Sequence, residues 1–161
     1  MLEASPAHTV MNALRRIVQG LRQSAAYSEK TTGLTAAQLL VLKNVSEHEG
    51  LSVNALASAT FTHQSTVSEI VSRLELKGFV SRDRAADDGR RVEIHLTPNG
   101  RSVLAVNPSS ASDRLMQAVK TLPTNTLYDL AIGLDALIRA AGLTDEAAVL
   151  FFDDNCPEDP S

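Results

Sequence analysis

The sequence predicts a mainly helical fold that carries one small β-hairpin. Apolar residues recur at intervals of three and four along most of the 161 residues, which is the period of an amphipathic helix. Residues 79–82 and 92–96 instead alternate between apolar and polar side chains, as strands do. Alanine and leucine, which favour helix, are plentiful, whereas aromatic residues make up only 4% of the chain.

The composition indicates one domain of an ordinary globular protein, with 43% hydrophobic and 21% charged residues. No apolar run approaches the roughly 20 residues that span a bilayer, so no membrane partner is expected. The first ten residues lack the basic and then apolar pattern of a secretory signal. We therefore expect a cytoplasmic protein, and the single cysteine, Cys156, fits a reducing compartment.

The formal charge of −4 argues at first against nucleic-acid binding, but its distribution changes that conclusion. Six of the 19 acidic residues lie in residues 144–161, and no lysine or arginine follows Arg139. Residues 1–143 therefore carry 15 basic and 13 acidic groups, a net charge of +2. Charge close to a contact matters more than the total, because salt screens distant charges.

The N-terminal part of the chain predicts two helices. The first covers Ala7–Tyr27, and its apolar stripe suits either a core helix or a dimer-forming helix. Residues Glu29–Gly33 are predicted to form a loop. Thr35 then precedes Gln38 by three residues, the spacing of a capping box. The helix that follows, to about Glu47, is strongly apolar and is therefore expected to be largely buried.

A helix, a turn and a second helix come next. Ser52 is a good N-cap for a short helix, Val53–Thr60. After a break at Phe61–His63, a second helix runs over Gln64–Lys77 and ends before Gly78. Its inward face is Val67, Ile70, Val71 and Leu74, and its outward face is Gln64, Ser65, Ser68, Ser72 and Arg73. Such short, hydrogen-bonding side chains suit the reading of base edges in a major groove, although a plain solvated face would look the same.

The two strand-like runs, Phe79–Arg82 and Val92–Leu96, predict an antiparallel hairpin with one buried face. Its charged turn, Asp83–Arg91, carries Arg84, Arg90 and Arg91. Arginines on a protruding turn suit phosphate or minor-groove contact, and a solvated mixed-charge loop is the alternative. Helix, turn, helix and ribbon together outline a winged helix-turn-helix, which favours DNA binding.

The C-terminal part predicts further helices. Thr97 caps one and Pro98 opens it, and Pro108 splits it into Asn99–Val106 and Ser110–Lys120. A last helix with a leucine stripe runs from Pro123 to about Ala141. The acidic tail, 144–161, is expected to begin with a short helix, and its apolar residues 149–152 are expected to dock on a neighbouring surface.

The segment Asp88–Thr97, DGRRVEIHLT, carries a specific pattern: Asp, one residue, Arg, three residues, an aliphatic, one residue, Leu-Thr. This pattern resembles the wing signature of the multiple antibiotic resistance (MarR) family. Supporting matches are Leu34-Thr35 with Gln38 and Leu42, Leu56-Ala57, Ser65-Thr66-Val67, and Arg73-Leu74-Glu75 ahead of Gly78. The resemblance covers roughly residues 34–100.

The resemblance implies a homodimeric, ligand-responsive repressor that binds a pseudo-palindromic operator in double-stranded DNA. Residues 1–33 and 98–143 would form a helical dimerisation region, and residues 34–97 the winged helix-turn-helix. A small aromatic or hydrophobic ligand would bind between them. The implied DNA-binding residues are Gln64, Ser65, Thr66, Ser68, Glu69, Arg73, Arg84, Asp88, Arg90 and Arg91. Arg90 would enter the minor groove, with its guanidinium oriented by Asp88.

Three residues depart from the family pattern. Phe61 and His63 stand where the family often has a glycine in the turn and a serine N-cap. We expect a wider turn with Phe61 buried. Glu69 stands where a basic residue is common, and it would repel phosphate unless it accepts from a cytosine or pairs with an arginine.

Other classes of function have little support in the sequence. It contains no phosphate-binding glycine loop, no HExxH, no nucleophile elbow and no paired cysteines, so we expect no enzyme and no cofactor. The four histidines are scattered, so no metal site is predicted. Peroxide sensing through a first-helix cysteine is not expected, because Cys156 lies in the tail. A winged helix that contacts only proteins remains the alternative, given the net negative charge and Glu69.

Overall fold

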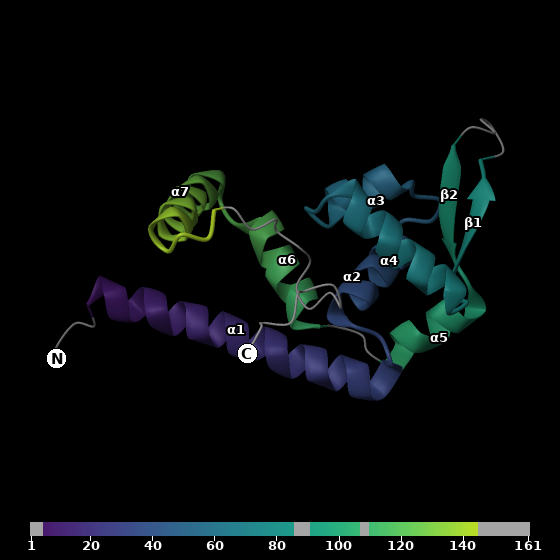
Figure 1. Cartoon of the computed structure of the whole chain (residues 1–161), viewed down its shortest axis with the longest axis horizontal. Helices are drawn as coiled ribbons and strands as arrows, with labels where there is room; N and C mark the ends of the chain where they lie inside the picture. Colours follow the sequence, from purple (N-terminus) through teal and green to yellow (C-terminus); the bar gives the residue numbers. More distant parts are fainter. Residues whose placement is uncertain (1–4, 86–90, 107–109, 145–161) are drawn as a thin grey trace.

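The computed structural model describes residues 5–85, 91–106 and 110–144, and within them it places seven helices and one two-stranded sheet (Figure 1). In chain order the elements are α1 (Pro6–Thr32), α2 (Ala36–Glu47), α3 (Val53–Ala59), α4 (Gln64–Leu76), β1 (Val80–Arg84), β2 (Val92–Leu96), α5 (Pro98–Val106), α6 (Ala111–Thr121) and α7 (Thr124–Ala140). The long α1 runs along one side of the molecule, and α7 lies at the opposite end from the hairpin (Figure 1).

Helix α1 is longer than the sequence predicted, and the loop expected at Glu29–Gly33 is helical up to Thr32. The hydroxyl of Thr31 donates to the carbonyl of Tyr27 at 2.8 Å, and that of Thr32 donates to Ser28 at 2.6 Å. These bonds run back along the helix, so the polar side chains do not interrupt it. The helix ends at Gly33, whose φ of 67° lets its N–H bond to the carbonyl of Glu29.

Helix α2 forms the centre of the core. The predicted capping box is confirmed, because Thr35 accepts from the backbone of Gln38 and the Gln38 side chain accepts from the backbone of Thr35. Nine of the twelve residues of α2 are buried. They pack with the inward faces of α3, α4 and the hairpin, including Leu56, Ile70, Leu74, Ile94 and Leu96. The core therefore belongs mainly to the predicted winged helix-turn-helix.

The turn between α3 and α4 differs from the prediction. Phe61 is 63% exposed and not buried, and its φ is 52°. Thr60 occupies the interior position instead, with 1% of its surface exposed and its hydroxyl bonded to the carbonyl of Leu56. The left-handed backbone at Phe61 brings the N–H of Thr62 within 3.0 Å of the carbonyl of Ala57. The turn is therefore tight, and the ring of Phe61 points away from the core.

The hairpin is antiparallel, with Val80 paired to Leu96 and Arg84 paired to Val92. Leu51 adds a single bridge to Ile94. Ile94 and Leu96 are buried as predicted, but Val92 is 43% exposed, because it lies near the tip of the hairpin, beyond the core. Strand β1 extends to Arg84, so the turn is shorter than Asp83–Arg91.

The predicted split of the C-terminal helix is confirmed, with α5 and α6 separated between Val106 and Ala111. Ser110 caps α6 through a capping box with Asp113. The carboxylate of Asp113 also pairs with Lys43 of α2 at 3.1 Å, and the backbone N–H of Ala111 donates to Ser24 of α1. These contacts attach α6 to both α1 and α2.

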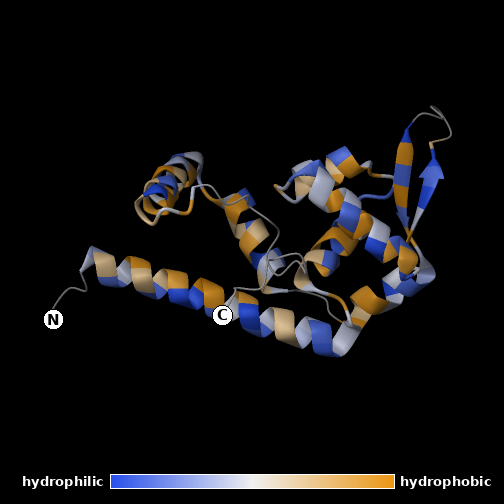
Figure 2. Cartoon of the chain, viewed as in Figure 1, coloured by the Kyte–Doolittle hydropathy of each residue, from blue (hydrophilic) through white to orange (hydrophobic). Residues whose placement is uncertain are grey.

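Helix α7 has no buried residue. Most of its leucine stripe and part of the stripe of α1 are exposed, and apolar residues recur along both helices in Figure 2. The exposed members include Val10, Met11, Ile17 and Val18 of α1 and Leu130, Leu134, Leu137 and Ile138 of α7. None of the helices described here combines the length and the apolarity needed to cross a membrane. The predicted tail helix and Cys156 lie outside the described residues.

Candidate nucleic-acid interface

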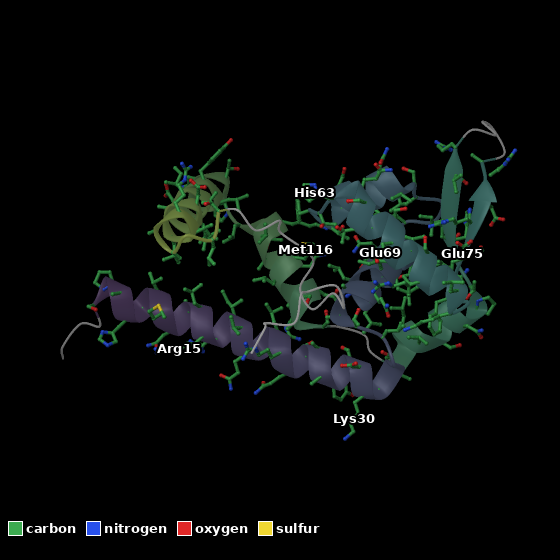
Figure 3. The ribbon with its side chains drawn as sticks, in the orientation of Figure 1. Arg15, Lys30, His63, Glu69, Glu75 and Met116 are labelled. Carbon is green, nitrogen blue, oxygen red and sulfur yellow. The ribbon has the colours of Figure 1, made fainter. Side chains whose placement is uncertain are left out.

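The outward face of α4 is polar from Gln64 to Arg73, and the exposed Leu76 ends the helix. Gln64, Ser65 and Glu69 are exposed, and Thr66, Ser68, Ser72 and Arg73 are partly buried. The opposite face is buried at every position that the sequence assigned to it. His63, at the N-cap, forms no capping hydrogen bond through its side chain. Figure 3 shows His63 at the start of α4 and Glu69 and Glu75 further along the helix.

Glu69 and Arg73 form an ion pair across one turn of α4, with an N–O distance of 2.8 Å. A carboxylate on a DNA-facing helix would repel phosphate unless it accepts from a cytosine or pairs with an arginine. Glu69 meets the second condition. Because both side chains are partly exposed, the pair adds little stability. Its main consequence is electrostatic, since the negative charge of Glu69 is offset on its own helix.

Arg82 of β1 connects the hairpin to α4. Its guanidinium donates to the hydroxyl of Ser72 at 2.9 Å and to the carbonyl of Ser68 at 3.4 Å. It also pairs with the carboxylate of Glu75 at 3.4 Å. The sequence pattern did not single out Arg82, although strand alternation places it on the same face as the buried Val80. In the structure that face points towards α4, which alternation alone does not reveal.

The tip of the hairpin carries the predicted wing residues. Arg84 is exposed at the end of β1, and Arg91 is exposed just before β2. The guanidinium of Arg91 pairs with Glu93 at 2.7 Å, and the other oxygen of Glu93 lies 3.6 Å from Nε2 of His95. Asp88 and Arg90 lie outside the described residues. The structure thus brings the α4 residues together on one face and places Arg84 and Arg91 on the adjoining hairpin.

Side-chain hydrogen bonds fix the end of α4 and the start of α5, where the hairpin joins the two helices. At the C-terminal end of α4, the ammonium of Lys77 donates to the carbonyl of Gly33 and to the side chain of Gln38. The hydroxyl of Thr97 donates to the carbonyl of Gly78 at 2.7 Å and accepts from the N–H of Gly100. A β-carbon at Gly100 would lie 2.7 Å from Leu96 Cδ1 and even closer to the carbonyl oxygen of Phe79. Only glycine therefore fits where α5 begins beneath the hairpin.

A metal site and a ligand pocket are the other kinds of site that a fold of this size can carry. In the described part of the chain, no group of three or more His, Cys, Asp and Glu residues could hold a metal ion. An open groove of about 270 Å³ lies between α1 and α6. Its lining includes Ile17, Gly20, Leu21 and Leu115, with Arg16 and Arg114.

A helix-turn-helix with a hairpin bonded to its second helix defines a winged-helix protein. A model of the MarR family matches residues 32–91, which contain α2, α3, α4 and β1. The transcriptional regulator HosA of Escherichia coli is 32% identical over 92 residues, which is 57% of this chain and 67% of HosA. The chain belongs to the MarR family. The relatives named here are transcriptional regulators and not enzymes.

A putative transcriptional regulatory protein for the hcr operon of Thauera aromatica is 35% identical over 88 residues. That alignment covers 55% of this chain and 53% of the Thauera protein, so the chain matches about half of that relative's length. The transcriptional regulator BldR from Sulfolobus solfataricus superposes with a TM-score of 0.55 at 26% identity, over 87% of this chain and 99% of BldR. The fold is also that of MepR of S. aureus in complex with DNA, with a TM-score of 0.56 at 20% identity, over 88% and 99% of the two chains.

Proposed function

We propose that this chain is a homodimeric transcriptional repressor that binds a pseudo-palindromic operator in double-stranded DNA and is released by a small hydrophobic or aromatic ligand. The observation that carries the proposal is the contact of Arg82 with Ser72 and Glu75. Through it the polar face of α4 and the hairpin form one unit. Such a unit can contact a groove and the adjoining backbone at the same time.

In this proposal, α4 lies in the major groove. Gln64, Ser65, Thr66 and Ser68 are short enough to let the helix approach base edges, and each can donate or accept a hydrogen bond. Arg73 would contact phosphate from the same face. Arg84 and Arg91, with Asp88 and Arg90 of the turn, would lie along the adjacent backbone and minor groove.

Exposed apolar surface on α1 and α7 supports the homodimer. Helix α7 has 17 residues and buries none of them in the isolated chain. Contiguous apolar surface of this kind usually marks an interface. A second copy of the chain would cover it by packing the same two helices against each other. Residues 1–33 and 98–143 would then be the dimerisation region, and residues 34–97 the DNA-binding region.

The groove between α1 and α6 supports the ligand response. Its volume of about 270 Å³ is just below the range of about 300–1,000 Å³ for small-molecule sites. Ile17, Leu21 and Leu115 give it apolar walls. Because α6 is also attached to α2 by the pair between Lys43 and Asp113, a ligand that moved α6 would act on the helix beneath α4.

The net charge of −4 favours a second candidate, a winged helix that contacts only proteins. A fluorescence anisotropy titration separates the two. The full chain is titrated into a labelled duplex from the region upstream of its own gene, with an unrelated duplex of equal length as the control. We expect tighter binding to the upstream duplex, with two chains for each duplex. Absence of binding to either duplex at about 50 mM salt would favour the protein-contact function, because low salt strengthens phosphate contacts.

A further inference from the structure

Phe61 has an unusual combination of backbone and exposure. Its φ of 52° lies in the left-handed region, and it is the one described residue other than glycine with a positive φ. A bulky residue in that region is a clear outlier. The side chain gains little burial in return, because 63% of the residue is exposed.

The fold does not need the ring of Phe61. The turn closes through backbone hydrogen bonds, from the N–H of Phe61 to Ser58 at 3.3 Å and from the N–H of Thr62 to Ala57 at 3.0 Å. Thr60 fills the interior beneath the turn. A glycine would form the same backbone bonds and would adopt this φ more easily. The ring therefore opposes the local backbone preference and lies mostly outside the core, which is a pattern associated with functional positions.

The position of Phe61 indicates what the ring can contact. It precedes the N-cap His63 by two residues, and the residues that follow, Gln64 and Ser65, are exposed at the start of α4. In helix-turn-helix proteins, the N-terminal residues of the second helix contact base edges. A phenyl ring has no hydrogen-bonding group. In the major groove it can recognise one apolar feature, the C5-methyl group of thymine.

We propose that Phe61 determines sequence specificity by packing its ring against a thymine methyl group in each half-site. This inference rests on the DNA-binding function proposed above and adds a base preference to it. The hydroxyl and amide groups of α4 would read neighbouring base pairs by hydrogen bonding. Phe61 would read one base pair by apolar contact alone.

Two measurements test the proposal. First, the wild-type chain and Phe61→Gly are each used to select duplexes from a randomised DNA pool. The wild-type chain should enrich thymine at one position in each half-site, and Phe61→Gly should not enrich it. Second, uracil replaces that thymine in the selected duplex and removes only the methyl group. Wild-type affinity should fall about four-fold, the value of one buried methyl group, whereas the affinity of Phe61→Gly should not change.

The controls separate specificity from folding. Phe61→Gly should keep a thermal midpoint equal to or above that of the wild type, because the strained φ is relieved. Leu76→Ala removes another exposed side chain, 89% exposed at the far end of α4, and should leave the response to uracil at about four-fold. Equal responses of the wild type and Phe61→Gly would overturn the role of Phe61 and leave DNA binding intact. A wild-type chain that selects no duplex would overturn the proposed function, and this inference with it.

Discussion

The guanidinium of Arg82 lies 2.9 Å from the hydroxyl of Ser72 and joins the first strand of the hairpin to the C-terminal half of α4. The same side chain pairs with Glu75 one turn further along the helix. Two elements that are separated by the turn at Lys77 and Gly78 are thereby held at a fixed angle. Substitution of Arg82 should consequently affect DNA binding more than folding.

Arg82→Ala should weaken DNA binding by about five- to ten-fold. Its thermal midpoint should fall only slightly, because partly exposed ion pairs contribute about 0–1 kcal/mol. The matched control is Arg101→Ala, which removes the same charge from an exposed pair with Glu49. Anisotropy titrations measure both variants. An equal loss of affinity in the two variants would mean that charge matters and that the position of Arg82 does not.

Gly100→Ala should destabilise the fold by about 1–3 kcal/mol, because its β-carbon would overlap the carbonyl oxygen of Phe79 and the side chain of Leu96. Gly20→Ala is the control, since nothing lies within 4 Å of a β-carbon there. In the middle of α1 that change should leave stability equal or raise it by up to about 1 kcal/mol. Urea unfolding at one protein concentration measures both. If Gly100→Ala is as stable as the wild type, Phe79 and Leu96 move away from the added β-carbon without a loss of stability.

His63→Ser should stabilise the chain by about 1 kcal/mol, because α4 begins without a side-chain cap and serine is a strong N-cap. Ser52→Ala tests the same interaction in the opposite direction. Ser52 accepts from the backbone of Ala55 at 3.2 Å, so its loss should cost a similar amount. Thermal unfolding should give a higher midpoint for His63→Ser and a lower midpoint for Ser52→Ala than for the wild type. A lower midpoint for His63→Ser would indicate that His63 has a stabilising role other than capping.

Leu134→Glu should dissociate the proposed dimer, because it places a charge in the exposed leucine stripe of α7. Ile132→Glu is the control. Ile132 is also exposed, but it lies on the helix face that carries Asp135 and Arg139, three and seven residues further on. Sedimentation velocity measures the mass of both. Two monomeric variants, or two dimeric ones, would contradict the assignment of the interface to the leucine stripe.

The parts of the fold that the sequence predicted depend on local interactions. Thr35 with Gln38 and Ser52 with Ala55 cap helices within four residues of chain, and both were predicted correctly. The buried face of α4 follows from its helical period alone. The errors arose where the local sequence allows two structures. Thr31 and Thr32 bond back to Tyr27 and Ser28 within α1, where a loop was predicted, and Thr60, not Phe61, fills the interior of the turn.

The candidate site, like the fold, was predicted in part. Residues on α4 could be assigned to one face from spacing, and the structure confirms that face. The pairing of Glu69 with Arg73 was one of the outcomes that the sequence left open. The contact of Arg82 with α4 was not predicted, since strand alternation gives the face of a residue but not the helix that packs against it. The roles of Asp88 and Arg90 stay predictions, because the turn lies outside the described residues.

The most direct test of DNA binding through α4 and the hairpin is the salt dependence of affinity for the selected duplex. About six phosphate contacts should make the logarithm of the binding constant fall with the logarithm of salt concentration with a slope near −5. Arg73→Ala should reduce that slope by about 1 at unchanged dimer mass. A wild-type slope close to zero, or no binding at low salt, would contradict DNA binding through α4 and the hairpin.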